Sequence, residues 1–178
     1  MLTYRYKLYS SKRNRKIDAM LREACFVWNH ALALQKRYYS LTGRYCSCAR
    51  MKSHFARRIS RCRLHSQTVQ EILERLDAAY QRFFLHLSSR PPKFKRAEQF
   101  RSIVYKQGGF KLNSNVLVLN SIKQHFQFSY SRPWEGTVKQ IRVKRTRSAS
   151  TTCTSSRMRL RSPAESHTMV HRSGWTSA

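Results

Sequence analysis

Apolar positions change their spacing along the chain, and each change predicts a different kind of element. Residues 2–9 alternate apolar with polar or basic side chains, a period of two that is typical of a strand with one buried face. From about residue 17 to residue 39, apolar residues return every three or four positions, which predicts a long helix. The same spacing returns more regularly from residue 66, so the best-patterned helix is expected there.

The first predicted helix carries a broad apolar surface. Phe26, Val27 and Leu34 widen its main stripe, which predicts burial on more than one side. Asn29 lies within this apolar run, and we interpret it as an interior amide with hydrogen-bond partners, because buried polar groups are normally paired. Gly43 follows the last apolar position and is expected to end the helix.

A short basic helix is expected at residues 48–63, before the well-patterned one. Ser66 is the expected N-cap of the latter, because its hydroxyl can accept from a free amide of the first turn. Pro91 and Pro92 end the helical region, since proline lacks the amide donor and restricts the residue before it. A basic segment with an aromatic at its centre, residues 93–96, comes next.

After residue 94 the pattern becomes that of strands. Apolar or alternating runs at residues 102–105, 110–112, 116–119, 126–130 and 138–143 are separated by turn-forming residues. Short strands with frequent turns predict a small barrel or sandwich. The strand at residues 2–8 needs a partner, so we expect it to join this later sheet. The predicted class is α+β, with the helices inserted between the first strand and the others.

Charge adds a function class to this picture. The chain has 178 residues, with 36 lysines and arginines against 8 acidic residues, a formal net charge of +28. Self-repulsion of this size favours a polyanionic partner, and nucleic acid supplies one phosphate per nucleotide. No run of about 18 apolar residues or lipidation signal points to a membrane. The N-terminal residues lack a signal-peptide core, so a cytoplasmic, nucleoid-associated location is expected.

Five cysteines, an odd number, favour reduced thiols. Cys46, Cys48, Cys62, His54 and His65 lie close enough in sequence to raise the question of zinc. A single C-x-C is not the usual pair of CxxC-like motifs, so we favour packing roles and expect no metal there.

Five segments resemble one family in order and spacing, across residues 1–147. They are YRYKLYSSKRNRKIDAML, CFVWNHALALQKRYY, SQTVQEILERLDAAYQRFF, PPKFKRAEQFRSI and GFKLNSNVLVLNSIKQHFQF. The set resembles the N-terminal part of the transposon-encoded TnpB/OrfB proteins, which are RNA-guided nucleases of the transposase class. The resemblance implies a wedge-type β-barrel at residues 1–12 and 92–147, interrupted by a helical recognition insert at residues 13–91. It also implies guide RNA and double-stranded DNA as partners.

Candidate nucleic-acid contacts follow from the chemistry of the side chains together with this resemblance. Amide and hydroxyl groups at the start of the third helix suit base edges, and basic groups suit phosphates. The candidate base-reading residues are Ser66, Gln67 and Gln70. The candidate phosphate-binding residues are Arg5, Lys7, Arg57, Arg58, Lys93, Lys95 and Arg96.

The family's RuvC-like nuclease domain needs several carboxylates around metal ions, and Mg²⁺ is expected for it. We find no such set in this chain, because most of its acidic residues fall on predicted helices among basic neighbours, where salt bridges explain them. Neither a catalytic residue nor a cofactor of its own is therefore expected. Residues 148–178 are rich in serine and threonine and are expected to be disordered.

A frameshift would explain this tail. Read one frame away, the codons for Ser148–Met158 can encode Gly-Glu-Tyr-Tyr-Leu-Tyr-Val-Val-Thr-Asp, a good strand. Those for Arg172–Ala178 can encode Val-Gly-Met-Asp-Phe-Gly, which resembles the start of the RuvC motif. The leading hypothesis is a truncated TnpB/OrfB-like protein with an out-of-frame tail that binds RNA or DNA. The alternatives are a stand-alone basic nucleic-acid-binding regulator and a small active transposase or nuclease.

Overall fold

The structure is a computed structural model, and it describes residues 2–9, 11, 14–58, 64–106, 108–134, 136–146 and 156–162. For Leu2 and for residues 156–162 only the backbone is described. Three helices and seven strands lie within these ranges, in the order β1, α1–α3, β2–β7. The α+β class predicted from the pattern is confirmed, and the helices do fall between the first strand and the rest.

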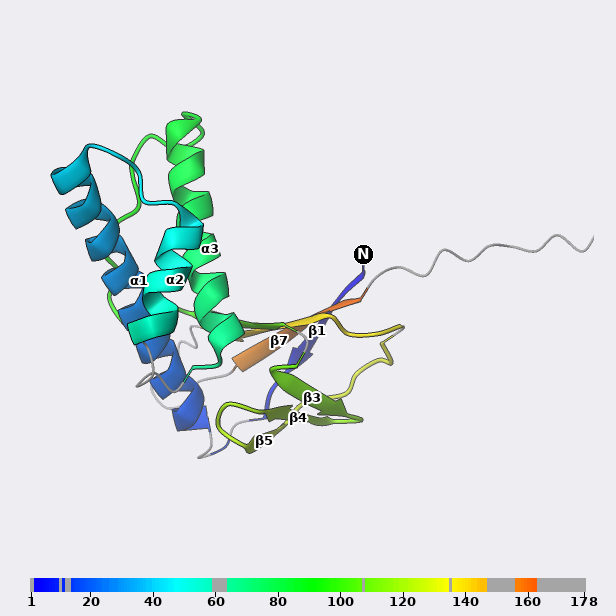
Figure 1. Cartoon of the computed structure of the whole chain (residues 1–178). Coiled ribbons are helices and arrows are strands. Elements are labelled where there is room, and N and C mark those ends of the chain that lie inside the picture. Colours follow the sequence, from blue (N-terminus) through cyan, green and yellow to red (C-terminus); the bar gives the residue numbers. More distant parts are fainter. Residues whose placement is uncertain are drawn as a thin grey trace, which may run out of the picture.

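The three helices lie side by side at one end of the molecule, on the left in Figure 1. They are α1 (Asn14–Thr42), α2 (Cys48–Arg58) and α3 (Ser66–Phe84). The N-cap of α3 is His65 rather than Ser66, and its imidazole accepts from the backbone N–H of Gln67 at 3.4 Å. The predicted cap was therefore one residue late, because histidine offers a ring nitrogen in place of the expected hydroxyl.

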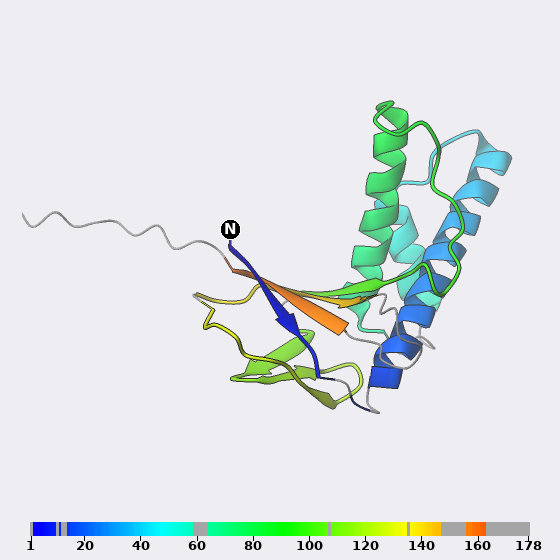
Figure 2. The same cartoon turned by 180° about the vertical axis from the view of Figure 1, so that it is seen from behind.

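The strands form two antiparallel sheets beside the helices (Figure 2). The larger has the order β1-β7-β6-β2 and the smaller the order β3-β4-β5. Their bounds are β1 (Leu2–Lys7), β2 (Ser102–Lys106), β3 (Phe110–Asn113), β4 (Val116–Leu119), β5 (Gln124–Gln127), β6 (Gln140–Arg145) and β7 (Ser156–Ser162). The hydrogen bonds of these described strands do not close into a complete barrel.

The end of β1 connects the two sheets. An isolated antiparallel bridge pairs Leu8 with Phe128, just after β5. Backbone bonds flank it, from Tyr9 N–H to the Gln127 carbonyl at 2.9 Å and from Ser129 N–H to the Lys7 carbonyl at 2.8 Å. The expectation that the first strand joins the later sheet is therefore confirmed.

β7 corrects the expectation of a disordered tail for residues 156–162. This strand lies between β1 and β6, with Leu160 in register with Tyr4 on one side and Ile141 on the other. The residues Arg157 to Arg161 alternate arginine with Met158 and Leu160, a period of two that the surrounding serine and threonine obscured. The other residues of the expected tail, 148–155 and 163–178, lie outside the described part of the chain.

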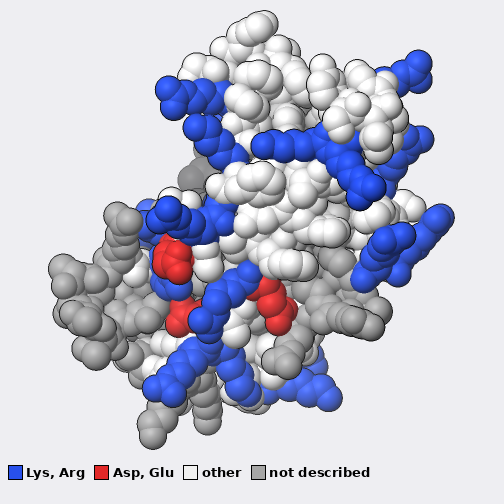
Figure 3. All heavy atoms as spheres, turned by 90° about the vertical axis from the view of Figure 1, so that its left-hand side faces the viewer, with Lys and Arg blue, Asp and Glu red and all other residues white. Residues whose placement is uncertain are grey.

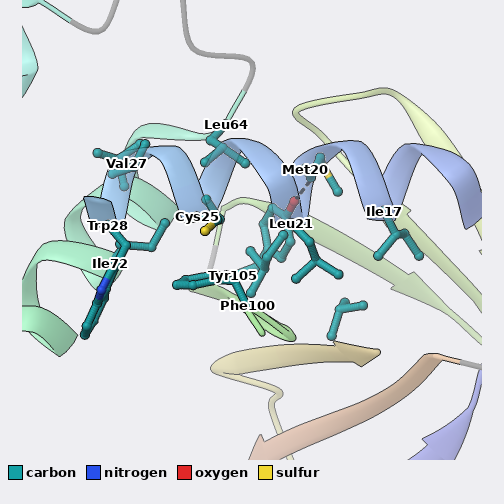
Figure 4. Packing of buried hydrophobic residues seen from close by; sticks show 14 of the residues in the cluster. Ile17, Met20, Leu21, Cys25, Val27, Trp28, Leu64, Ile72, Phe100 and Tyr105 are labelled. Carbon is teal, nitrogen blue, oxygen red and sulfur yellow. Dashed lines mark hydrogen bonds between the residues drawn. The ribbon is translucent and has the colours of Figure 1, made fainter. Parts of the chain in front are cut away.

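α1 packs one stripe of side chains into a core shared with the sheets. Figure 4 shows Ile17, Leu21 and Trp28 on the same side of this helix, turned toward Phe100 and Tyr105 from the segment after α3. The prediction that α1 is buried on more than one side is wrong at Phe26, which is 70% exposed, although Val27 beside it is buried. Phe26 lies outside the buried stripe of α1, because the neighbouring elements cover only part of the surface of this helix.

Glu74 joins three elements through two ion pairs. Its carboxylate on α3 lies 2.8 Å from Lys52 Nζ on α2 and 3.1 Å from Lys106 Nζ on β2. The hydrogen bond from Lys52 lowers the pKa of Glu74 by more than burial raises it, and Lys106 lowers it further. Glu74 thus fixes the basic helix α2 relative to the sheet.

Glu74→Gln is expected to lower the free energy of unfolding at pH 7 by about 0.5–1 kcal/mol, since partly exposed pairs contribute little. A carboxylate with a lowered folded pKa stabilises the fold above its unfolded pKa, and that contribution is lost as the pH falls. The difference from wild type should therefore shrink as the pH falls below about 4.3, the value of an unperturbed glutamate, and through the lower folded pKa. Urea titrations from pH 7 to pH 3 measure it, and Glu98→Gln, at an exposed position, controls for net charge. A difference independent of pH would contradict the assignment.

Candidate nucleic-acid interface

Basic side chains spread over the helical side of the molecule. Figure 3 views this side and shows many lysines and arginines with few acidic residues between them. Arg57 and Arg58, two of the predicted phosphate-binding residues, are exposed in the last turn of α2. Arg50, Ser53 and His54 join them around a shallow hollow on the same helix. This hollow has the charge and the exposure that a phosphate group requires.

Acidic residues near this face are occupied in structural contacts. Glu71 pairs with Arg75 at 2.8 Å within α3, and Asp18 of α1 pairs with Arg145 of β6 at 3.2 Å. With the two pairs of Glu74, these confirm that salt bridges explain the acidic residues at positions 18, 71 and 74. Because none of these pairs involves Arg57 or Arg58, the positive charge of the last turn of α2 has no carboxylate ion-pair partner among the described residues.

The three predicted base-reading residues lie at the start of α3. Ser66 and Gln70 are exposed and line a groove between α2 and α3, together with Lys52 and Leu73. Gln67 is half-buried, and its side-chain oxygen is buried with no hydrogen-bond partner among the described residues. The structure thus brings Gln70, with its side chain accessible, to the same side as the basic end of α2.

The basic segment 93–96 is held along α1 by three side chains. Asn29 donates to the Lys95 carbonyl at 2.8 Å and accepts from the Lys95 backbone N–H at 2.9 Å. Trp28 Nε1 donates to the Lys93 carbonyl and Cys25 Sγ to the Lys95 carbonyl, both at 3.2 Å. The interpretation of Asn29 as a paired interior amide is confirmed, and its partner is this segment. We call this set of contacts the α1 clamp.

The α1 clamp separates the predicted phosphate ligands of this segment. Lys93 and Arg96 are exposed, whereas Lys95 is only partly accessible. Lys95 Nζ lies 3.7 Å from the centre of the Trp28 ring, close enough for a cation–π contact. Burial lowers the pKa of Lys95, and repulsion from Arg75 adds to the effect. Its ammonium group is therefore engaged with α1 in the free protein.

Arg5 and Lys7 lie exposed on β1, remote in sequence from the other candidates. The register of the larger sheet places Arg5 opposite Arg159, and Arg159 opposite Arg142. Lys7 is likewise in register with Arg157, and Arg157 with Lys144. Basic residues thus meet in two rows across three strands.

Sequence reasoning missed a series of aromatic rings that runs from α1 to α2. Phe26 and His30 stack with centroids 6.0 Å apart, and His30 and His54 stack at 6.3 Å. The buried Phe55 touches His30 edge-on at 5.4 Å. The sequence contained a signal for this arrangement: Arg22, Phe26 and His30 follow one another at spacings of four, which places them on one face of α1.

The described cysteines are free thiols, as expected for reduced residues. Cys25 and Cys46 are buried, and burial raises the pKa of each thiol. Within the described ranges, no group of three or more His, Cys, Asp or Glu residues is arranged to hold a metal ion. Cys62, one of the residues considered for zinc, lies outside those ranges.

None of the helices in the described part of the chain is long and apolar enough to cross a membrane. No protein-family model matches the chain, and no curated protein is significantly similar to it. The interface is therefore interpreted from its own geometry: an exposed basic helix end, an accessible amide beside it, and a basic segment held on α1.

Proposed function

We propose that this chain binds nucleic acid and forms the recognition part of a TnpB/OrfB-like protein that contacts a guide RNA and double-stranded DNA. One observation carries the proposal: the helical face holds many basic groups (Figure 3), while the carboxylates of Asp18, Glu71 and Glu74 are paired with bases other than Arg57 and Arg58. A face of this kind binds polyanions by releasing their counterions, which needs no specific pocket.

The α1 clamp supports the narrower part of the proposal. Two segments on which the resemblance to TnpB/OrfB proteins rests, CFVWNHALALQKRYY and PPKFKRAEQFRSI, contact each other directly through Asn29 and Lys95. Segments that belong to one architecture are expected to meet in space, although they lie far apart in the sequence. The contact therefore favours a shared architecture over five unrelated similarities.

We extend the proposal to a wedge-type barrel built from the two sheets. Its support is the strand connectivity: β1 pairs with β7 and also bridges to Phe128 of the smaller sheet. At the other edge, β2 continues into β3 through a turn at Gly108 and Gly109. The helices enter this arrangement between β1 and β2, where the recognition insert is proposed.

Within this arrangement, Gln70 is the proposed base-reading residue and the exposed Lys93 and Arg96 are proposed phosphate ligands. An amide can donate and accept at one base edge, so its accessible position beside the basic end of α2 suits a groove of DNA. Phosphate contacts fix the position of the helix but carry no sequence information.

The proposal is tested with RNA transcribed from the DNA that flanks this chain's own gene. We expect the purified chain to bind this RNA at least tenfold more tightly than a scrambled RNA of equal length, in equilibrium titrations at 150 mM KCl. Equal affinity for the two RNAs would show that the protein binds nucleic acid through its charge, without recognising this RNA. Guide-dependent DNA cleavage by the chain with Mg²⁺ would instead identify it as a nuclease in its own right.

Arg57→Glu/Arg58→Glu is expected to weaken RNA binding and to reduce its salt dependence. Two lost phosphate contacts should lower the slope of log K against log salt by about 1.4, at about 0.7 per contact on single-stranded nucleic acid. Titrations between 50 and 300 mM KCl measure it. Lys111→Glu/Lys139→Glu makes the same charge change at exposed positions outside the helices. An equal loss in both variants would show that only net charge matters.

A further inference from the structure

One exposed feature of the helical face is not explained by phosphate binding. Phe26 is 70% exposed on α1, although covering such a ring would stabilise the protein. A single exposed apolar residue is ordinary. Phe26, however, is the outermost member of a series of three offset-stacked rings, followed by His30 and His54. We call these three residues the ring ladder.

The ring ladder is anchored in the core at one end and open at the other. Phe55 is 2% exposed and contacts both histidine rings, His30 at 5.4 Å and His54 at 5.9 Å. The histidines are therefore held by a rigid neighbour, and they join α1 to α2. Phe26 has the offset stack with His30 and remains largely in contact with solvent.

Basic groups lie beside the His54 end of the ring ladder. His54 lines the hollow of α2 together with Arg50, Arg57 and Arg58. Stacked rings beside a basic groove are the combination by which proteins bind single strands, since every base has a face that can stack and every nucleotide a phosphate.

We propose that the ring ladder is a stacking platform for unpaired nucleobases of a single-stranded nucleic acid, with Arg57 and Arg58 binding the adjoining phosphates. Charge complementarity favours this occupant over a protein partner, because an apolar partner surface would leave the hollow's arginines unpaired. The inference deepens the proposed function and rests on it. It adds the requirement that part of the bound strand be unpaired at α1 and α2.

RNA strands that lack bases distinguish the contribution of base stacking from that of phosphate binding. The probes are a 12-nucleotide RNA, an RNA of the same length whose central nucleotides lack bases, and a 12-base-pair RNA duplex. We expect wild type to bind the intact strand about tenfold more tightly than the abasic strand at equal charge, since base stacking on an aromatic ring has about this value. Phe26→Ala should remove this preference and leave the affinity for the abasic strand unchanged.

Two further variants keep the result interpretable. Phe26→Trp should retain the preference and quench 2-aminopurine placed at the centre of the intact strand. Tyr39→Ala, which removes an aromatic that is 62% exposed on the same helix, should leave the preference unchanged. If Phe26→Ala weakens both strands equally, or neither, the stacking platform is wrong. Loss of abasic-strand binding in Arg57→Glu/Arg58→Glu would still uphold the proposed function, so the two failures are distinguishable.

Discussion

Leu160→Pro is expected to destabilise the larger sheet by about 2–4 kcal/mol. Leu160 is the middle of β7, which pairs with β1 on one side and β6 on the other. Proline removes an amide donor from a strand with neighbours on both sides, and its ring disturbs the pairing around it. Urea unfolding monitored by circular dichroism measures the loss.

The matched control is Ser162→Pro, at the last residue of the same strand. It should cost much less, because Ser162 is in register with β1 alone, whereas Leu160 has partners in both β1 and β6. Hydrogen exchange adds a local measurement: in Leu160→Pro the amides of β1 should lose protection, while those of α3 keep it. Unchanged stability and unchanged protection of β1 would show that residues 156–162 do not hold the sheet together.

Asn29→Ala is expected to lower the free energy of unfolding by about 2–4 kcal/mol. The substitution removes both amide bonds of the α1 clamp and leaves the backbone N–H of Lys95 without its partner. Asn29→Asp keeps the acceptor for that N–H and loses the donor, so its effect should be intermediate. Thermal and urea unfolding of the three proteins compare them directly.

The same substitution should also reduce RNA affinity, because the clamp fixes where Lys93 and Arg96 lie. Gln81→Ala, at an exposed position of α3, is the control and should change stability by less than about 0.5 kcal/mol. If Asn29→Ala were as stable as this control, the paired amide would be incidental to the fold.

The helices and most strands could be predicted because their signals are local. The spacing of Ile72, Leu73 and Leu76 predicts α3, and all three side chains are fully buried. The turn at Gly108 was predictable for the same reason, since its φ of 93° favours glycine. Boundaries were less accurate, as the N-cap at His65 shows.

Features that depend on neighbours distant in sequence were not predictable from the pattern. Arg22 and His30, four positions before and after Phe26, mark its side of α1 as partly polar, but how much of the Phe26 ring stays exposed depends on where α2 and the sheets pack. Lys95 was predicted to bind phosphate from its charge, and its stacking on Trp28 follows from a contact across 67 positions of the chain. Asn29 is the useful exception, because an amide inside an apolar run predicts a partner even when its identity is unknown.

The pairing of β1 with β7 has a consequence for how the chain folds during synthesis. β1 is synthesised before the other described elements, yet Leu160, which is in register with Tyr4 of β1, is among the last described residues to be made. The helices depend on local contacts and can form before β7 is synthesised. They should therefore fold early, while β1 is still unpaired. Closing so long a loop is slow, and an unpaired strand edge is prone to aggregation. Slower translation should therefore lower the yield of folded protein, because it lengthens the time during which β1 lacks β7.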